Sequence, residues 1–337
     1  MPVRQLPLKL FRPSPASSSS TFSSVELCAG GGGQAIGLEQ AGFSHRVLVE
    51  IDRHAVQTLK NNRPHWVVEQ TDLASWSGKD FRGSDLLAAG LPCPPFSKAG
   101  KQLGAGDERN LFPEALRVIS EIRPKAVMIE NVRGILDAVF DDFRHRFQGQ
   151  VEAMGYKAGW RLLNASDYGV GQLRPRVVFV ALLPNVWRSF AWPGPQDQSP
   201  TVGDILFESL SQHGWKGARA WKDQAQSVAP TLVGGSKKHG GPDLGPTRAR
   251  HAWAALGIDG IGLADSPPPM DFVGMPRLTV EMCALVQGFP KDWKFAGGKT
   301  AAYRQVGNAF PPPVACAVAS QIAVALDAAR NLQARAA

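Results

Sequence analysis

Short, almost wholly apolar runs alternate with helical patterns through the first half of this chain. The strand-like runs are Val25–Leu27, Arg46–Ile51, Trp66–Val68, Leu86–Ala89 and Ala126–Ile129. The helical patterns lie between most of them, at Gln34–Ala41, His54–Asn61 and Leu111–Glu121. Strands that are apolar at nearly every position are typical of parallel sheets buried on both faces, so this order predicts a doubly wound α/β fold.

Two later apolar runs, Trp160–Leu163 and Val177–Leu182, are expected to join the same sheet. The composition changes at Pro184, where a stretch rich in Gly and Pro begins that holds five of the nine tryptophans. We therefore expect a first domain over residues 23–183 and a smaller, irregular domain over residues 184–275.

Helical periodicity returns near the end of the chain, at Thr279–Val286 and Pro313–Ala328. Residues 276–337 are therefore predicted to pack back on the first domain. Residues 1–22 contain four prolines and a serine run, which predicts a flexible arm, with an organelle transit peptide as the alternative.

Composition narrows the class of protein. The 337 residues carry a formal charge of +8, and their hydrophobic content of 44% excludes a disordered chain. The positive excess suits an acidic partner such as nucleic acid, and equally a role in solubility alone. No apolar run reaches the roughly 18 residues that cross a bilayer, so we expect no membrane partner. The four cysteines are far apart, which favours reduced thiols and predicts no metal site.

Glycines follow the first predicted strand directly, in the run Leu27–Gly33. A glycine-rich turn between a strand and a helix lets a ligand approach the backbone and meet the helix N-terminus. Glu50 ends the next strand, where a carboxylate can bind both ribose hydroxyls. Together they predict a nucleoside cofactor, either a nicotinamide or S-adenosylmethionine. Asp72 follows the third strand and suits an adenine amino group or, alternatively, a helix cap.

Cys93 lies in the segment Gly90–Ser97, directly after the fourth predicted strand. Ligands of doubly wound sheets bind beyond the carboxyl ends of the strands, so this thiol is expected at the active edge. A lone cysteine is otherwise a small core residue. The flanking prolines make a poor core, and we therefore favour a nucleophile.

Two further polar segments are expected at that edge. Glu130 ends the fifth strand, where it could act as a general acid, although a strand-end Glu is also a common surface charge. Gln172, Arg174 and Arg176 alternate along an extended segment and are predicted to point together. They would suit a base edge or a phosphate, with a plain basic edge strand as the alternative.

These motifs, in this order, resemble those of the DNA (cytosine-5)-methyltransferases. The resemblance rests on Leu27–Gly33, Glu50, Asp72, Pro92-Cys93, Glu130-Asn131-Val132, Gln172-x-Arg174-x-Arg176 and Arg304–Ala309. It covers about 23–183 and 276–328. It implies a Rossmann-like sheet that binds S-adenosyl-L-methionine, with S-adenosyl-L-homocysteine as product, and a target-recognition domain over 184–275. Cys28 stands where the family often has Phe, and Pro94 where it often has Gln.

The resemblance also implies the roles of single residues. The Cys93 thiolate would add to C6 of a flipped-out cytosine, Glu130 would assist at N3, Arg176 would hold O2 and Arg174 would support that loop. The implied cofactor-binding residues are Leu27, Cys28, Ala29, Gly30, Gly31, Gly32, Gly33, Glu50, Ile51, Asp72, Leu73, Pro92 and Asn308. The implied DNA-binding residues are Ser97, Gln172, Thr231, Leu232, Lys237, Lys238, Arg248 and Arg250.

Charge within residues 184–275 supports a DNA-facing segment. The region has 8 basic and 8 acidic residues, but Lys216–Arg250 holds 7 basic and 2 acidic ones. This basic segment contains Thr231-Leu232, which resembles the family's recognition mark. A solvated basic loop is the alternative.

The rival functions are a tRNA cytosine-5 methyltransferase, a non-catalytic DNA-binding homologue and, more distantly, an NAD-dependent dehydrogenase. The length of the 184–275 insertion favours a reader of double-stranded DNA. The resemblance implies a bacterial, cytoplasmic enzyme that acts as a monomer in a restriction-modification system, with a separately acting restriction endonuclease as a partner. An orphan or phage methyltransferase without such a partner is the alternative.

Overall fold

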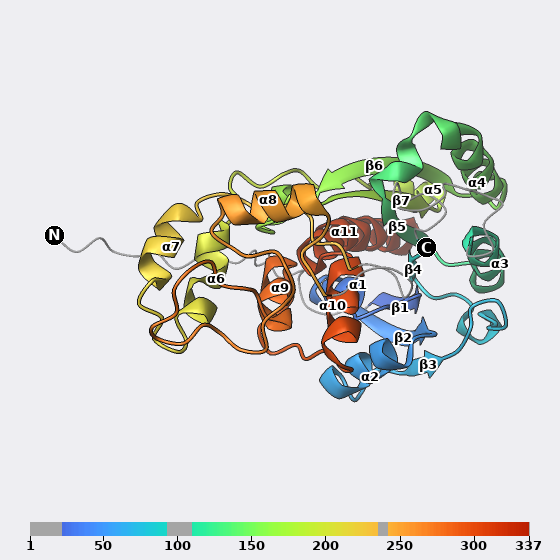
Figure 1. The fold of residues 1–337 in the computed structure, drawn as a ribbon. Helices are drawn as coiled ribbons and strands as arrows, with labels where there is room; N and C mark the ends of the chain where they lie inside the picture. The colour runs from blue at the N-terminus through green and yellow to red at the C-terminus, as the bar shows by residue number, and fades with distance from the viewer. Residues whose placement is uncertain (1–21, 93–109, 235–241, 337) are drawn as a thin grey trace.

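The computed structural model describes residues 22–92, 110–234 and 242–336. Four predicted site residues, Cys93, Ser97, Lys237 and Lys238, lie outside these ranges. Seven strands form one sheet in the order β3-β2-β1-β4-β5-β7-β6 (Figure 1). The strands are β1 (Phe22–Leu27), β2 (Phe43–Glu50), β3 (Val68–Gln70), β4 (Leu86–Gly90), β5 (Ala126–Val132), β6 (Lys157–Asn164) and β7 (Pro175–Leu182).

The sheet is mixed, and the two late strands that the sequence predicted to join it run in opposite directions. The pairs formed among β1 to β5 are all parallel. β7 is antiparallel to both of its neighbours, β5 and β6. β6 and β7 are joined by a short connection containing the 3₁₀ helix η5 (Ala165–Tyr168). A connection of that length cannot hold a crossover helix, so it returns the chain antiparallel. The third strand also begins later than predicted, because Trp66 is a core residue ahead of it.

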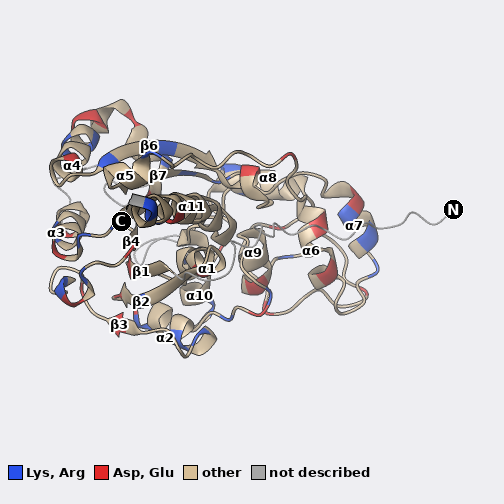
Figure 2. Cartoon of the chain, turned by 180° about the vertical axis from the view of Figure 1, so that it is seen from behind, with Lys and Arg blue, Asp and Glu red and all other residues tan. Residues whose placement is uncertain are grey.

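Helices cover both faces of the sheet. The helices of the first part are α1 (Gly33–Gln40), α2 (Arg53–Asn62), α3 (Phe112–Ile122), α4 (Asp141–Ala153) and α5 (Pro184–Trp187), with short 3₁₀ turns η1 (Lys79–Phe81), η3 (Arg133–Leu136) and η4 (Ala138–Phe140). α3 and α4 pack on one face, and α1 and α11 (Pro312–Ala336) on the other. Charged positions are visible along α4, α7 and β6 (Figure 2).

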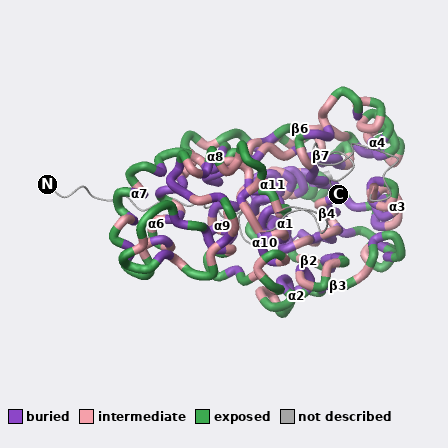
Figure 3. Tube along the Cα trace, in the orientation of Figure 1, coloured by how far each residue is buried: buried purple, intermediate pink, exposed green. Residues whose placement is uncertain are grey.

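α11 packs on α1 and on one face of the sheet. A Cβ placed on Gly37 of α1 would lie 2.5 Å from Cβ of Ala315, so the two helices meet at backbone distance. Among the described residues, Lys299–Arg335 is the one helical stretch long and apolar enough to cross a membrane, and 72% of its apolar window is buried. The stretch includes α11, which lies in the middle of the molecule (Figure 3) and contributes many residues to the core.

The smaller part of the molecule is built from short helices and irregular segments, of which the sequence pattern had indicated only the helix at Thr279–Val286. They are α6 (Val202–Leu210), α7 (Ala218–Gln224) and α8 (Thr247–Ala255), followed by α9 (Val280–Val286) and α10 (Lys299–Asn308). Its core, which includes Trp215, Trp221 and Trp253, is continuous with residues of α1 and α2. Trp187 and Trp192 instead pack with the α11 cluster, so the stretch just after Leu183 lies on the sheet.

Candidate functional site

The glycine-rich turn has an alternating left-handed backbone. Cys28, Gly30 and Gly32 have φ values of 54°, 55° and 90°. A left-handed conformation is unfavourable for a residue with a side chain, and such strain clusters at functional sites. No side chain caps α1 at Gly32, so its first N–H groups remain available to an anionic ligand.

Only one of the four glycines faces open space. A Cβ on Gly30 would meet nothing within 4 Å, whereas one on Gly33 would lie 2.3 Å from the carbonyl oxygen of Phe310. Gly31 and Gly32 are likewise covered, by Gln305 and Trp293. The sequence assigned all four to ligand approach, but three of them admit the returning C-terminal segment.

Glu50 joins the turn to the end of β2. Its carboxylate is 8% exposed and accepts hydrogen bonds from the N–H groups of Gly30 and Asp52, both at 2.7 Å. Burial raises the pKa of Glu50, and these N–H groups oppose that rise. The Ile51 N–H also acts on this carboxylate, whose two oxygens offer about four lone pairs in all, so capacity for a further donor remains. Ile51 beside it is 63% exposed, which suits an apolar ring.

A cavity of about 430 Å³ adjoins these residues, lined by Ile51, Asp52, His54 and, from α10, Arg304. Asp72 is exposed, and its Oδ1 accepts a hydrogen bond from the N–H of Ala74 at 3.0 Å. This contact resembles a helix cap, which was the alternative interpretation of Asp72. Asn308 at the end of α10 is also exposed.

The buried members of the predicted cofactor set are Leu27, Ala29 and Leu73, with 0%, 6% and 3% exposure. Their side chains belong to the core, so at most their backbone reaches a ligand. The Cys28 thiol is partly buried, and burial together with Glu50 and Asp72 raises its pKa. The described cysteines are free thiols.

Glu130 and Arg176 form an ion pair at the carboxyl edge of the sheet. Arg176 Nε lies 2.8 Å from Glu130 Oε1, and the two side chains are 11% and 6% exposed. Burial raises the pKa of Glu130, while Arg176 and Arg174 oppose that rise. The pKa of this carboxyl group therefore lies above that of a solvated Glu, as a proton donor requires.

Strand register brings the Pro92 segment to the same edge. Gly90 of β4 pairs with Glu130 of β5, and the Asn131 amide donates to the carbonyl of Leu91 at 3.4 Å. The sequence did not predict this hydrogen bond from Asn131 to the segment that leads to Pro92.

Arg174 and Gln172 do not face the same space as Arg176. Arg174 is 0% exposed, and its guanidinium donates to the carbonyl oxygens of Leu232 at 2.7 Å, Gly307 at 2.6 Å and Ala309 at 3.0 Å. The last two carbonyls end α10, where a cation is favourable. Gln172 and Arg174 both contact Leu232, whereas Arg176 pairs with Glu130, so the predicted common direction holds for two of the three side chains. Gln172 lies outside β7, in a bridge to Ala229.

Gln172 is also fully buried. Its Oε1 accepts from the N–H of Leu232 at 2.8 Å, and its Nε2 donates to Gln287 Oε1 at 2.6 Å. Gln287 in turn donates to Ala309 O at 2.7 Å. Contrary to the sequence prediction, Gln172 and the buried Leu232 are not on a DNA-accessible surface. Instead, Gln172, Arg174 and Gln287 form a hydrogen-bond network, which we call the buried hub.

The remaining predicted DNA contacts are nearer the surface. Thr231 is partly exposed and donates to the carbonyl of Leu173. Arg248 is exposed at the start of α8, and Arg250 is partly exposed with a hydrogen bond to Thr247. No ion pair involving either arginine occurs within the described ranges.

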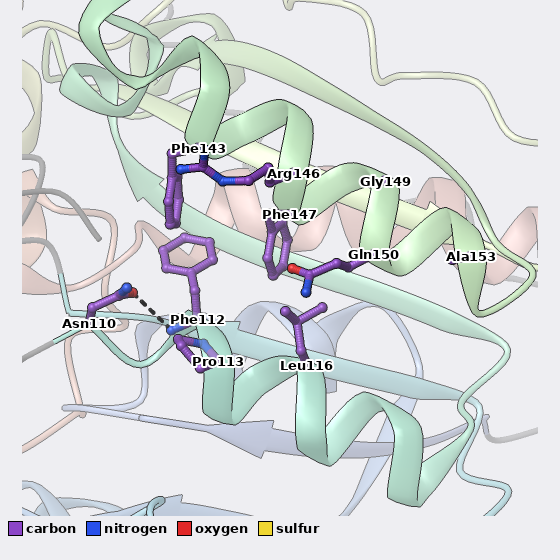
Figure 4. Close-up of a pocket in the computed structure, with 10 residues that line it drawn as sticks. All are labelled: Asn110, Phe112, Pro113, Leu116, Phe143, Arg146, Phe147, Gly149, Gln150 and Ala153. Atoms are coloured by element: carbon purple, nitrogen blue, oxygen red, sulfur yellow. Dashed lines mark hydrogen bonds between the residues drawn. The ribbon is translucent and has the colours of Figure 1, made fainter. Parts of the chain in front are cut away.

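A larger cavity, of about 540 Å³, lies between α3 and α4 and is lined by Phe112, Leu116, Phe143 and Phe147 (Figure 4). It contains none of the predicted site residues. Within the described part of the chain, no group of three or more His, Cys, Asp or Glu side chains could hold a metal ion.

Comparison with known proteins identifies the family. The model of the C-5 cytosine-specific DNA methylases matches residues 22–253 and 262–324. The chain is 52% identical over 309 residues to Type II methyltransferase M.NgoMIV of Neisseria gonorrhoeae, covering 90% of this chain and 98% of that protein. It is 53% identical to Type II methyltransferase M.NaeI of Lentzea aerocolonigenes, covering 90% of this chain and 75% of that protein.

Solved structures share the fold. The Entamoeba histolytica methyltransferase EhMeth has a TM-score of 0.64 at 14% identity, covering 92% of this chain and 99% of that one. A Spodoptera frugiperda DNMT2 mutant has a TM-score of 0.61 at 17% identity, covering 91% of this chain and 100% of that one. The fold and the match along most of its length together show that the chain belongs to the C-5 cytosine-specific DNA methylase family and is a DNA cytosine-5 methyltransferase.

Proposed function

We propose that the protein transfers a methyl group from S-adenosyl-L-methionine to C5 of a flipped-out cytosine, at a specific sequence in double-stranded DNA. The observation that carries this proposal is the buried Glu130–Arg176 pair beside the strand end that leads to Cys93. One acid, one cation and one thiol at a single sheet edge are the groups that such a reaction on a cytosine ring requires.

The residues at the ends of β1 and β2 fit this cofactor. Glu50 keeps acceptor capacity for two ribose hydroxyls, exposed Ile51 offers a surface for adenine, and the open side of Gly30 admits the amino-acid end. Asp72 would bind the adenine amino group and Asn308 would close the site, with Pro92 beside it. The cofactor supplies an electrophilic methyl group when it is bound.

The protein's own groups would make C5 reactive. The Cys93 thiolate adds to C6, forming a sulfur–carbon bond, and the ring electron pair moves toward C5. Glu130 donates a proton or hydrogen bond at N3, and Arg176 holds O2. After C5 is methylated, its proton leaves and the thiolate is expelled. Arg174 acts here as a positioning residue, because it is fully buried and its guanidinium is engaged by backbone carbonyls.

The base must leave the duplex for a thiol to approach its face. Residues 184–275 would lie across the DNA as the recognition region, with Thr231, Arg248 and Arg250 near phosphates or bases, together with Ser97, Lys237 and Lys238. This assignment is supported by the local positive charge of Lys216–Arg250. We further propose that the enzyme acts as a cytoplasmic monomer that protects DNA from a cognate restriction endonuclease.

Methyl transfer by the Cys93→Ala variant tests the mechanism. We expect transfer to double-stranded DNA by the native protein and none by the variant. A duplex with 5-fluorocytosine should trap a covalent adduct with the native protein, because fluorine cannot leave C5 as a proton does. Full activity of the variant, or an active enzyme that forms no adduct, would overturn attack at C6.

A further inference from the structure

The segment Phe289–Ala296, between α9 and α10, lies directly on the glycine-rich turn, and we call it the wall segment. Its central side chain is Trp293, which is 3% exposed. The indole Nε1 donates to the carbonyl oxygen of Gly31 at 3.0 Å, and a Cβ on Gly32 would lie 2.7 Å from the indole ring. Trp293 therefore contacts two of the four glycines, one through a hydrogen bond and one through its ring.

The wall segment is itself held firmly against α2. The Asn62 side chain donates to the carbonyl of Lys294 at 2.7 Å and accepts from its N–H at 2.9 Å. Thr58 accepts from the N–H of Ala296 at 2.8 Å and donates to Gln305 at 2.7 Å. These bonds fix the backbone on one side of Trp293, so the indole is a rigid support.

The hydrogen bond to Gly31 fixes one peptide plane of the turn. In a trans peptide the carbonyl and the following N–H point in opposite directions. With the Gly31 carbonyl held by Trp293, the Gly32 N–H is directed inward and donates to the carbonyl of Ala29 at 3.2 Å. This bond closes the turn around Gly30, whose outer side is open.

We infer that Trp293 is a positioning residue that sets the glycine-rich turn for the amino-acid end of the cofactor. The inference rests on the proposed function, in which Gly30 receives that end. Trp293 does not touch the reacting atoms. Its contribution is to the affinity for the carboxylate and ammonium groups of the cofactor, and the adenosine end depends on other residues, chiefly Glu50 and Ile51.

The test compares Trp293→Phe with Trp253→Phe. The first removes the indole donor and keeps an aromatic ring. The second is the matched control, because Trp253 is also fully buried and its Nε1 has no partner in the described part of the structure. Calorimetry with S-adenosylhomocysteine should show binding about three- to tenfold weaker for Trp293→Phe and unchanged for Trp253→Phe, as expected for one hydrogen bond.

A second ligand separates positioning from general damage. Affinity for 5′-methylthioadenosine, which lacks the amino-acid end, should be unchanged in Trp293→Phe, and KM for the cofactor should rise without a change in kcat. Equal weakening of both ligands, or unchanged affinity for S-adenosylhomocysteine, would overturn the inference. Failure of the native protein to bind S-adenosylhomocysteine would instead contradict the proposed function.

Should Trp293→Phe fail to fold, Asn62→Asp provides the same test from the other side of the wall segment. It removes the donor to Lys294 and leaves the acceptor in place. We expect the same selective loss of S-adenosylhomocysteine affinity in the folded variant. The inference would again be overturned if the variant bound both ligands as tightly as the native protein does, or if its affinity for both fell by the same factor.

Discussion

Arg174 and Arg176 lie two residues apart, yet they belong to different regions of the molecule. Arg176 pairs with one carboxylate at the edge of the sheet, next to the space where the substrate would bind. Arg174 belongs to the buried hub and donates to three backbone carbonyls, that of Leu232 and two at the end of α10. The two guanidinium groups therefore have different partners, a carboxylate for Arg176 and backbone carbonyls for Arg174, although only one residue separates them in the sequence.

Among the predictions that test this difference, Glu130→Gln is expected to have the largest effect, a loss of methyl-transfer activity. The amide cannot supply a proton, and loss of a general acid lowers rates by about 10²- to 10⁴-fold. Methyl transfer at saturating cofactor and DNA measures the effect. Glu152→Gln, in an exposed position on α4, is the control and should keep native activity. A variant at position 130 with native activity would break the comparison.

Arg174→Met should act on stability. It leaves the carbonyls of Leu232, Gly307 and Ala309 buried without their donor, and each such group costs about 1–3 kcal/mol. We expect a total loss of about 3 kcal/mol or more in the free energy of urea unfolding. Arg176→Met should lower activity instead, with a much smaller loss of stability. Equal losses from both substitutions would erase the distinction between the two arginines.

Gln172→Leu gives a smaller effect of the same kind. It removes the acceptor for the Leu232 N–H and the donor to Gln287, and we expect a loss of about 1–3 kcal/mol in unfolding free energy. The salt dependence of DNA binding should stay native, since a buried amide releases no counterions. If the variant's DNA binding depended less steeply on salt concentration than that of the native protein, Gln172 would have to be counted among the DNA-contacting residues.

The smallest effect is a pH dependence of stability. Glu130 has a pKa above its ordinary value of 4.5 because it is buried. Its contribution to stability is therefore fully present below pH 4.5 and is lost as the pH rises through the raised pKa. Each pKa unit of difference corresponds to about 1.4 kcal/mol.

Unfolding free energies measured from pH 4 to 8 should therefore fall more steeply for the native protein than for Glu130→Gln. Glu26, whose pKa burial also raises, is present in both proteins and cancels in the difference. Parallel curves would show that Arg176 compensates the burial of Glu130 fully.

Local patterns predicted the sheet positions and the carboxyl-edge residues well. Apolar runs and strand ends depend on neighbouring residues, so Glu50 and Glu130 could be placed at strand ends from sequence alone. The family resemblance, carried by the ordered motifs, predicted the family that the comparisons confirmed. The roles assigned to Cys93, Lys237 and Lys238 stay predictions, because these residues lie outside the described ranges.

Long-range packing could not be predicted in the same way. Nothing near Gln172 in the sequence announces its bond to Gln287, 115 residues away. Likewise, a glycine that admits a ligand and one that admits another backbone look the same in a sequence. Gly30 faces open space, whereas Gly33 is covered by the carbonyl oxygen of Phe310 in the C-terminal segment.

The bond between Trp293 and Gly31 joins residues that are 262 positions apart. During synthesis the glycine-rich turn leaves the ribosome early, but its support arrives only when the wall segment has been made. A nascent chain can therefore carry the strand-end acids without a finished cofactor turn. By this reasoning, a nascent chain that lacks the wall segment would bind the proposed methyl donor weakly.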